Sequence, residues 1–426
     1  MKPRGRGPRY LASVASSIAT VVAGFGAAAI GTVALGACAG CGATAHETSL
    51  NTIAAGSFDG VDIDQGAHLL YMTDRVNKGL DVVDVGRTTP RFVQSVALGA
   101  LPNGLAIASD RHRVYVGMDG GNVAVVDTDT GSPTFMKVIG RIAVDKTKAD
   151  LVDYSPIRNR LYVSTSGGGE VVGVDTLTNR VSERYDLNMP VEQPRYNPAD
   201  GMLYITSPGD DSLVQVDPSN SRVLNRYPVP GCRASGLAIN PARRLALVAC
   251  SGSLALFNLG SGEHTITRVV EGGDLVSYNA AADRFVVASP HGSKDSAVGV
   301  FAGDGTFLGS VPATPKAHAA AFDSSQGLVF APGVAGILSF APAACAPTPD
   351  WVKVLMGLSV YAVPLMLIGL VLFFYGRARD RERELEATTG RSRWRVRREY
   401  LAAERERMRA LEDAILDPPD HHRFST

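Results

Sequence analysis

Seven polar positions recur along this chain, each just ahead of a short apolar run, at steps of roughly 39 to 47 residues. The equivalent positions are Asp59, Asn103, Asp150, Glu192, Ser235, Asp274 and His318. Four of the seven are carboxylates. Crowded carboxylates have raised pKa values, or they require a divalent cation or a basic group from a partner. These residues therefore form a candidate ligand site, with a solvated polar rim as the alternative.

The segments that would position these residues repeat with a similar period. A short apolar run begins each repeat, at Leu70-Tyr71, Val114-Tyr115, Leu161-Tyr162, Leu203-Tyr204, Leu245-Ala246, Phe285-Val286 and Leu328-Val329. Further runs such as "GLAINPARR", "EVVGVDTLTN" and "RVLNRYPVPG" precede and follow these pairs. The runs are short, rich in β-branched residues and bounded by Gly, Pro, Asp or Asn, which predicts strands.

Four strands in each unit of forty-odd residues predict an all-β fold, a seven-bladed β-propeller of four-stranded blades. A β-solenoid is the alternative, but its turns are much shorter. The seventh unit stops after its third run, "GILSFAPA". We expect "SLNTIAAGSF", Ser49 to Phe58, to supply the missing outer strand, because ring closure protects exposed strand edges. The propeller is thus predicted over residues 49–342.

The stretches "LYVSTSGGGEVVGVDTLTNRV" and "VYVGMDGGNVAVVDTDTG" resemble the YVTN-type seven-bladed propellers. The resemblance extends over roughly residues 58–341 and weakens in the last three units, where "LALFNLGSG" lacks the Val-Asp-Thr ending. It implies the fold more strongly than a function, because such propellers serve in binding, in scaffolding and as several kinds of enzyme.

In a propeller, the first strand of each blade lines the central channel, and its start lies at the face that usually binds ligands. The seven polar positions would therefore form a ring at the channel mouth. One ring further in, the same alignment places Asp62, Asp153 and Arg195, which could pair with one another. Because successive strands alternate in direction, we expect the chain to enter and leave the propeller on the face opposite the mouth.

No catalytic motif is present in the sequence. It has no H-E-x-x-H, G-x-S-x-G or phosphate-binding loop, and no His follows Cys38-Ala39-Gly40-Cys41 for haem attachment. The eight His are scattered and the formal net charge is zero, which argues against a copper centre and against nucleic-acid binding. We predict no cofactor, apart from a candidate divalent cation at the mouth.

The cysteines suit an oxidising compartment. Cys232 opens the first strand of the fifth unit and Cys250 ends the second, so an antiparallel hairpin would bring them together in a disulfide. Cys41 and Cys345 flank the seam of the ring and are a second candidate pair, although sequence alone does not fix connectivity.

Two apolar runs predict contact with a membrane. Residues 1–38 begin with basic residues and continue without charge from Tyr10 to Ala37, which indicates a signal peptide or a retained anchor. Leu35-Gly36-Ala37-Cys38 also fits a lipoprotein cleavage box with Cys38 lipidated. Residues 354–375 carry no charge and are long enough to span a bilayer. The Arg-rich flank that follows predicts that residues 376–426 are cytoplasmic.

We accordingly expect linkers at 39–48 and 343–353, and a cytoplasmic helix from Ser392 to Leu416 that contacts anionic lipid. The sequence favours a non-enzymatic binding or scaffold module, anchored in the cytoplasmic (inner) membrane with its propeller on the extracytoplasmic, periplasmic side. Its partners would be the membrane and an extracytoplasmic protein or small ligand. The alternatives are a propeller hydrolase or lactonase that uses a cation at the mouth, and a sensor that signals through the tail.

Overall fold

The computed structural model describes residues 45–49, 57–87, 89–166, 168–270, 272–290, 296–342, 350–389 and 393–416. These residues divide into two compact units, which separate after Pro347. Cys38, Cys41 and Cys345 lie outside the described residues, so lipidation and the second disulfide remain predictions.

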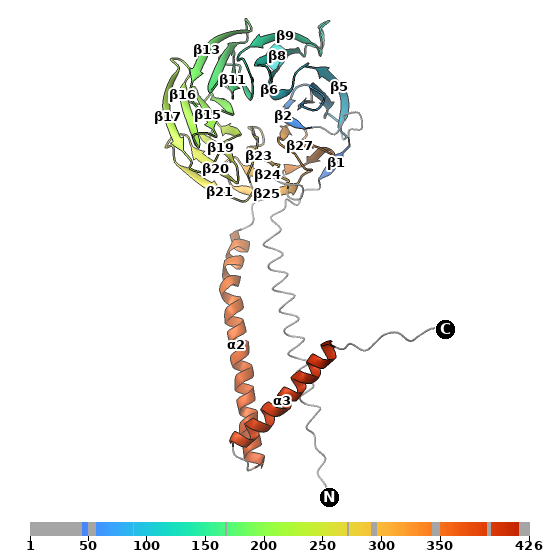
Figure 1. Cartoon of the computed structure of the whole chain (residues 1–426), viewed down its shortest axis with the longest axis vertical. Coiled ribbons are helices and arrows are strands. Elements are labelled where there is room, and N and C mark those ends of the chain that lie inside the picture. Colours follow the sequence, from blue (N-terminus) through green and yellow to red (C-terminus); the bar gives the residue numbers. More distant parts are fainter. Residues whose placement is uncertain are drawn as a thin grey trace, which may run out of the picture. The chain divides into compact units, whose positions relative to one another are not determined.

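The first unit is a ring of seven four-stranded antiparallel sheets around a central axis (Figure 1). The first four blades, each given from inner to outer strand, are β2 (Phe58–Asp64), β3 (Leu69–Asp74), β4 (Gly79–Asp84) and β5 (Arg91–Ala97); β6 (Pro102–Ala108), β7 (Arg113–Met118), β8 (Asn122–Asp127) and β9 (Val138–Ala143); β10 (Val152–Ser155), β11 (Arg160–Thr165), β12 (Glu170–Asp175) and β13 (Arg180–Asp186); and β14 (Pro194–Asn197), β15 (Met202–Ser207), β16 (Ser212–Asp217) and β17 (Arg222–Pro228). A 3₁₀ turn, η1 (Ser109–Arg111), joins β6 to β7.

The last three blades complete the ring. They are β18 (Leu237–Asn240), β19 (Leu245–Cys250), β20 (Ser253–Asn258) and β21 (His264–Thr267); β22 (Val276–Asn279), β23 (Arg284–Ser289), β24 (Ala297–Ala302) and β25 (Phe307–Pro312); and β26 (Ala321–Asp323), β27 (Leu328–Gly333), β28 (Gly336–Phe340) and β1 (His46–Thr48). The predicted seven-bladed fold with four-stranded blades is therefore confirmed.

The core lies between neighbouring blades. Tyr71, Tyr115, Tyr162 and Tyr204 occupy the same place on the second strand of blades one to four, and each is 1% exposed or less. One cluster joins Tyr115 and Val125 of the second blade to Leu161 and Val172 of the third. The recurring Leu-Tyr or Val-Tyr pair is thus the part of the sequence that packs blade against blade, which explains its period.

The ring closes with an N-terminal strand, as predicted. The prediction that residues 49–58 form this strand was wrong. β1 pairs antiparallel with β28, matching His46 to Ser339 and Thr48 to Ile337. In the expected segment, Phe58 instead begins the inner strand of the first blade and pairs with Asp74, and residues 50–56 lie outside the described part. The closing strand has three polar residues, so it carries no alternation of apolar side chains by which a sequence pattern could locate it.

Both chain ends of the propeller lie on the face opposite the channel mouth. In β27, Gly333 lies at the mouth end, where it pairs with Gly336, whereas Val329 pairs with Phe340 near the far end. β28 therefore ends away from the mouth, and the antiparallel β1 enters from that same side. The predicted exit of the chain on the far face is confirmed.

The second unit contains two helices, α2 (Asp350–Thr389) and α3 (Arg393–Leu416). The predicted tail helix is confirmed, whereas α2 begins within the segment expected as a linker and continues past the Pro in the middle of its apolar stretch. Among the described residues, no helix combines the length and hydropathy that mark a membrane crossing.

Candidate ligand-binding site at the channel mouth

The seven predicted site residues lie at equivalent places on the seven inner strands. Asp59 and Asn103 lie near the starts of β2 and β6, and the other five precede the inner strands of their blades by a few residues. Backbone hydrogen bonds join neighbouring blades here: Gly104 N donates to the Asp150 carbonyl at 3.2 Å and Leu275 N to the His318 carbonyl at 3.1 Å. The fold thus places the seven predicted residues at equivalent points at one end of the channel.

Glycine next to a ring residue allows this close approach. Gly236 N donates to the Asp274 carbonyl at 2.9 Å, and a Cβ on Gly236 would lie 2.2 Å from that same oxygen. A Cβ on Gly104 would lie 2.8 Å from the Leu151 Cα. The glycine that follows Asp59, Asn103 and Ser235 in the sequence is a signal of this close approach that no motif indicated.

Three hydroxyl groups on the second strands hold the inner strands at the mouth. Thr73 Oγ1 accepts from Gly60 N at 2.6 Å, and Ser164 Oγ accepts from Leu151 N at 3.0 Å. Thr206 Oγ1 accepts from Gln193 N at 2.9 Å. These hydroxyls occur in blades one, three and four, which carry three of the four ring carboxylates. They are positioning residues that no sequence motif had indicated.

Three of the four carboxylates have cationic partners. Arg75 contacts Asp59 at 3.2 Å, Lys148 contacts Asp150 at 2.7 Å, and His318 Nδ1 contacts Asp274 at 2.5 Å. Arg75 also donates to the Pro102 carbonyl at 3.1 Å and to the side chain of Asn103. These pairs supply much of the countercharge that a divalent cation would otherwise provide.

Glu192 is the carboxylate in this ring for which the described structure shows no ion pair. Its backbone N–H bonds to the Thr206 carbonyl at 2.9 Å, which fixes its place on the mouth. Burial, followed by the nearby charges of Asp150, Asp274 and Asp59, raises the pKa of Glu192 to about 7, although Lys148 opposes the shift. At pH 7 Glu192 is therefore ionised in about half of the molecules, and its charge is then only partly compensated.

The pKa values of two further groups shift for reasons that lie within the same ring. Burial raises the pKa of Asp59, with Arg75 opposing it and the charges of Asp274 and Asp150 adding to it. The hydrogen bond to Asp274 raises the pKa of His318, against the effect of its burial. At a given pH, His318 is therefore protonated in a larger fraction of molecules than an unperturbed histidine would be.

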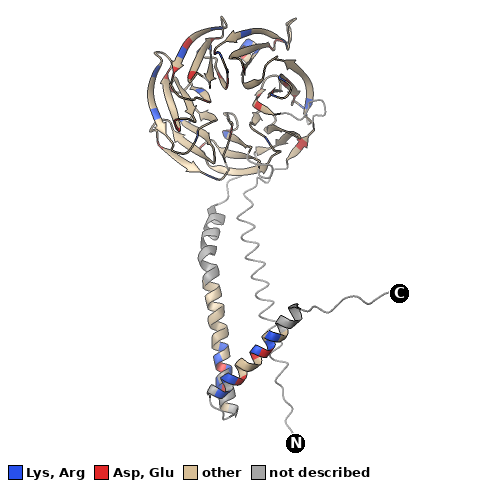
Figure 2. Ribbon diagram, in the orientation of Figure 1, with Lys and Arg blue, Asp and Glu red and all other residues tan. Residues whose placement is uncertain are grey.

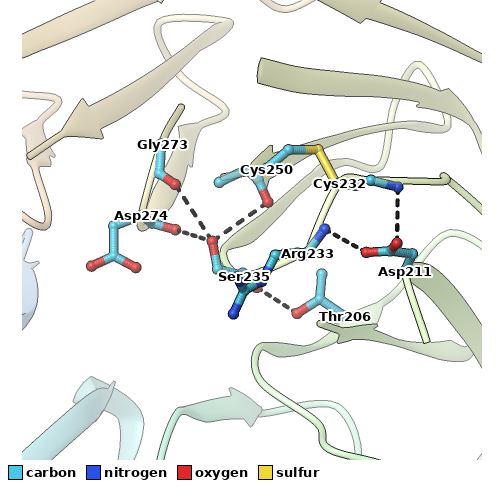
Figure 3. The surroundings of a disulfide bond; sticks show 10 residues. Thr206, Asp211, Cys232, Arg233, Ser235, Cys250, Gly273 and Asp274 are labelled. Carbon is cyan, nitrogen blue, oxygen red and sulfur yellow. Dashed lines mark hydrogen bonds between the residues drawn. A yellow bond between two sulfur atoms is a disulfide. The ribbon is translucent and has the colours of Figure 1, made fainter. Parts of the chain in front are cut away.

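Ser235 is tied to the backbone of two blades. Its hydroxyl lies 3.2 Å from the Asp274 carbonyl (Figure 3) and 3.4 Å from the Ala249 carbonyl. The predicted disulfide between Cys232 and Cys250 is confirmed next to it, with the two Cα atoms 4.5 Å apart. This bond fastens the segment before β18 to the end of β19 and so supports the mouth at the fifth blade.

Below the mouth, a cavity of about 310 Å³ occupies the channel. Its lining includes Asp62, Asp153 and Arg195, as the alignment of the repeats predicted. Arg195 pairs with Asp153 at 3.0 Å. Within the described ranges, no group of three or more His, Cys, Asp or Glu side chains is arranged to hold a metal ion.

Comparison with known proteins shows the fold alone. No family model matches the chain, and no curated protein matches it. A chain of Kuenenia stuttgartiensis hydrazine synthase is similar, with a TM-score of 0.58 and 14% sequence identity, over 68% of this chain and 96% of that chain. Because 1699 solved chains match, this likeness identifies a common architecture, and function has to be argued from the site.

Proposed function

We propose that this chain is a non-enzymatic binding module that receives a basic group of an extracytoplasmic partner protein at its acidic channel mouth. The observation that carries the proposal is the position of Glu192, which lies among three other carboxylates with no ion pair of its own in the described part of the chain. A lysine or arginine side chain of a partner would compensate this charge, in the way that complementary charges at interfaces favour one partner over others.

The repeat type is proposed from the sequence. The segments "LYVSTSGGG" and "LYITSPGDD" belong to β11 and β15 and the turns that follow, where a Thr or Ser near the strand end holds the inner strand. This hydroxyl gives a structural reason for the cadence shared with YVTN-type propellers, and it supports placing the chain among them.

Anchoring in the cytoplasmic membrane is part of the proposal. In α2, the described apolar side chains include Leu365, Val371 and Phe373, which are 68%, 66% and 57% exposed. This part of α2 is uncharged, and charged residues begin directly after it (Figure 2). A bilayer around residues 354–375 would cover these side chains and place the Arg-rich flank in the cytoplasm. Because the chain enters and leaves the propeller on the far face, the mouth would then point away from the membrane.

Co-purification from detergent-solubilised membranes tests the binding proposal. We expect Glu192→Gln in the tagged full chain to lower recovery of the partner by about tenfold or more, since one hydrogen bond between charged groups contributes roughly 1.5–3 kcal/mol. Glu170→Gln is the matched control, because Glu170 starts β12 at the same end of its blade and pairs with Arg184 instead. Equal recovery by wild type and both variants would contradict the proposal.

A second candidate function, a hydrolase or lactonase, rests on the contact between His318 and Asp274. A carboxylate at Nδ1 would orient the ring and leave Nε2 free to exchange a proton with a substrate. The test is turnover of a panel of esters and lactones by the full chain. A hydrolase would lose about a hundredfold or more of its rate in His318→Asn, whereas absence of turnover in the wild type would leave binding as the function.

A further inference from the structure

The channel cavity has a charge that its own lining does not balance. Its lining residues come from six of the seven inner strands and from the residues just before the seventh, and they include three charged side chains: Asp62, Asp153 and Arg195. The cavity volume of about 310 Å³ lies near the lower limit of pockets that hold small molecules. With all three groups ionised, the lining carries one net negative charge.

Arg195 is held in place by hydrogen bonds from two of its three guanidinium nitrogens. Its Nε donates to the Leu237 carbonyl at 3.0 Å, and its Nη1 lies 3.3 Å from the Val152 carbonyl and 3.0 Å from Asp153 Oδ1. The other oxygen of Asp153 accepts from Tyr196 N at 2.8 Å. The guanidinium is therefore held between blades three, four and five, and it cannot move to Asp62 without breaking these bonds.

Asp62 has no cationic partner of this kind among the described residues. The hydrogen bond that its side chain accepts is local, from the N–H of the next residue, Ile63, to Oδ1 at 2.8 Å. The side chain is exposed to the channel, yet protein surrounds that channel, and this burial raises the pKa of Asp62 to about 6 against the opposing effects of the Ile63 hydrogen bond and Arg195. At pH 7 the group is mostly ionised, and a cation in the cavity would stabilise it.

The lining favours an organic cation over a metal ion, because within the described ranges no three His, Cys, Asp or Glu side chains are arranged to hold a metal. Beside a larger share of polar surface, the cavity has apolar side chains, contributed by Val61, Leu105, Ile107, Val152, Ile239 and Val276. Two of its polar side chains already donate to the backbone: Ser277 Oγ to the Ala320 carbonyl at 2.8 Å, and Gln193 Nε2 to the Pro194 carbonyl at 2.9 Å. The cavity thus combines one carboxylate that has no ion pair among the described residues with a lining of mixed polar and apolar character.

We propose that the channel binds a small alkylammonium compound, with its ammonium group against Asp62 and its hydrocarbon part against the apolar lining. This site is separate from the mouth and does not depend on the proposed partner protein or on the membrane. The charge-assisted hydrogen bond to Asp62 provides selectivity for amines, and the apolar side chains of the lining add affinity in proportion to the apolar area that they cover.

Titration calorimetry of the detergent-purified full chain with n-hexylamine tests this site. We expect saturable binding at pH 7.5, and binding weaker by about tenfold or more in Asp62→Asn, because a hydrogen bond to a charged group is lost. The neutral analogue 1-hexanol should bind the wild type as weakly as hexylamine binds the variant. Equal binding of amine and alcohol, no saturable binding, or unchanged affinity in Asp62→Asn would overturn the proposal.

Two further measurements distinguish binding at Asp62 from binding elsewhere on the chain. Affinity should fall by about tenfold between pH 7.5 and pH 5, since protonation of Asp62 removes the charge while the amine stays protonated. Glu192→Gln should leave hexylamine binding unchanged even if it abolishes partner recovery, so the two proposals fail independently. A thermal unfolding curve of each variant confirms that it is folded, and affinity that is unchanged down to pH 5 would also contradict the role of Asp62.

Discussion

Asp81 is a buried carboxylate in an apolar position, and replacing it by Asn should stabilise the propeller. The side chain lies on β4, and the residue is 1% exposed. The residue equivalent to Asp81 on the third strand is Ala124 in the second blade and Val172 in the third. Burial is the main cause that raises the pKa of Asp81 to about 7, and the neighbouring Asp74 adds to it, while Ser95 opposes it. Within the described structure, the Oδ2 atom of Asp81 has no hydrogen-bond partner.

The sign of the pH effect follows from the direction of this shift. Asp81 is protonated in the folded protein below about pH 7, whereas in the unfolded chain its pKa returns to the ordinary value of 3.8. Its contribution to stability is therefore complete below about pH 4 and is lost as the pH rises toward 7. The rise from 3.8 to about 7 corresponds to roughly 4 kcal/mol. Asp81→Asn removes the ionisation, so its free energy of unfolding should exceed that of the wild type by up to this amount above pH 7.

Denaturant unfolding of the full chain between pH 4 and pH 8 measures the effect. The wild type should lose stability across this range relative to Asp81→Asn, and the two curves should converge near pH 4. Asp84→Ala is the control, because Asp84 lies on the same strand but accepts hydrogen bonds from Gly86 N at 3.1 Å and Arg87 Nε at 2.9 Å. It should destabilise the protein at neutral pH, the opposite of the effect expected for Asp81→Asn. Parallel pH profiles for the wild type and Asp81→Asn would refute this reasoning.

Three other predictions concern closure and orientation. Replacing both Cys232 and Cys250, which are 18 residues apart, by Ala should lower the free energy of unfolding by about 3 kcal/mol; an unchanged denaturation midpoint would count against it. Deleting His46–Thr48 should destabilise the whole ring in a urea melt, since β28 becomes an open edge, and a melt like that of the full chain would contradict closure by β1. In vesicles, a cysteine introduced in place of Lys316, near the mouth, should react with a soluble thiol reagent faster than a cysteine introduced in place of Ala67 on the far face. The reverse order of rates would contradict the proposed orientation.

The repeat pattern was sufficient to predict the blades. Runs such as "RLYVST" and "EVVGVD" alternate with turn residues, and their apolar positions are those that pack between blades. Because the strands of one blade are neighbours in sequence and antiparallel, local patterning fixed their order and register. The same register predicted the ring at the mouth and brought Cys232 next to Cys250. The closing strand was misplaced because three polar residues carry no periodic signal.

Tertiary structure alone decided which charges pair. Asp62, Asp153 and Arg195 occupy equivalent positions, so the sequence allowed any pairing among them. Arg195 bonds to Asp153 at 3.0 Å because blades three and four are adjacent, whereas Asp62 belongs to the first blade. At the mouth, Arg75 reaches Asp59 from the end of the neighbouring strand, and no cation of the described residues pairs in this way with Glu192. Electrostatic pairing depends on distance across the ring, and that distance is fixed only when the blades close around the channel.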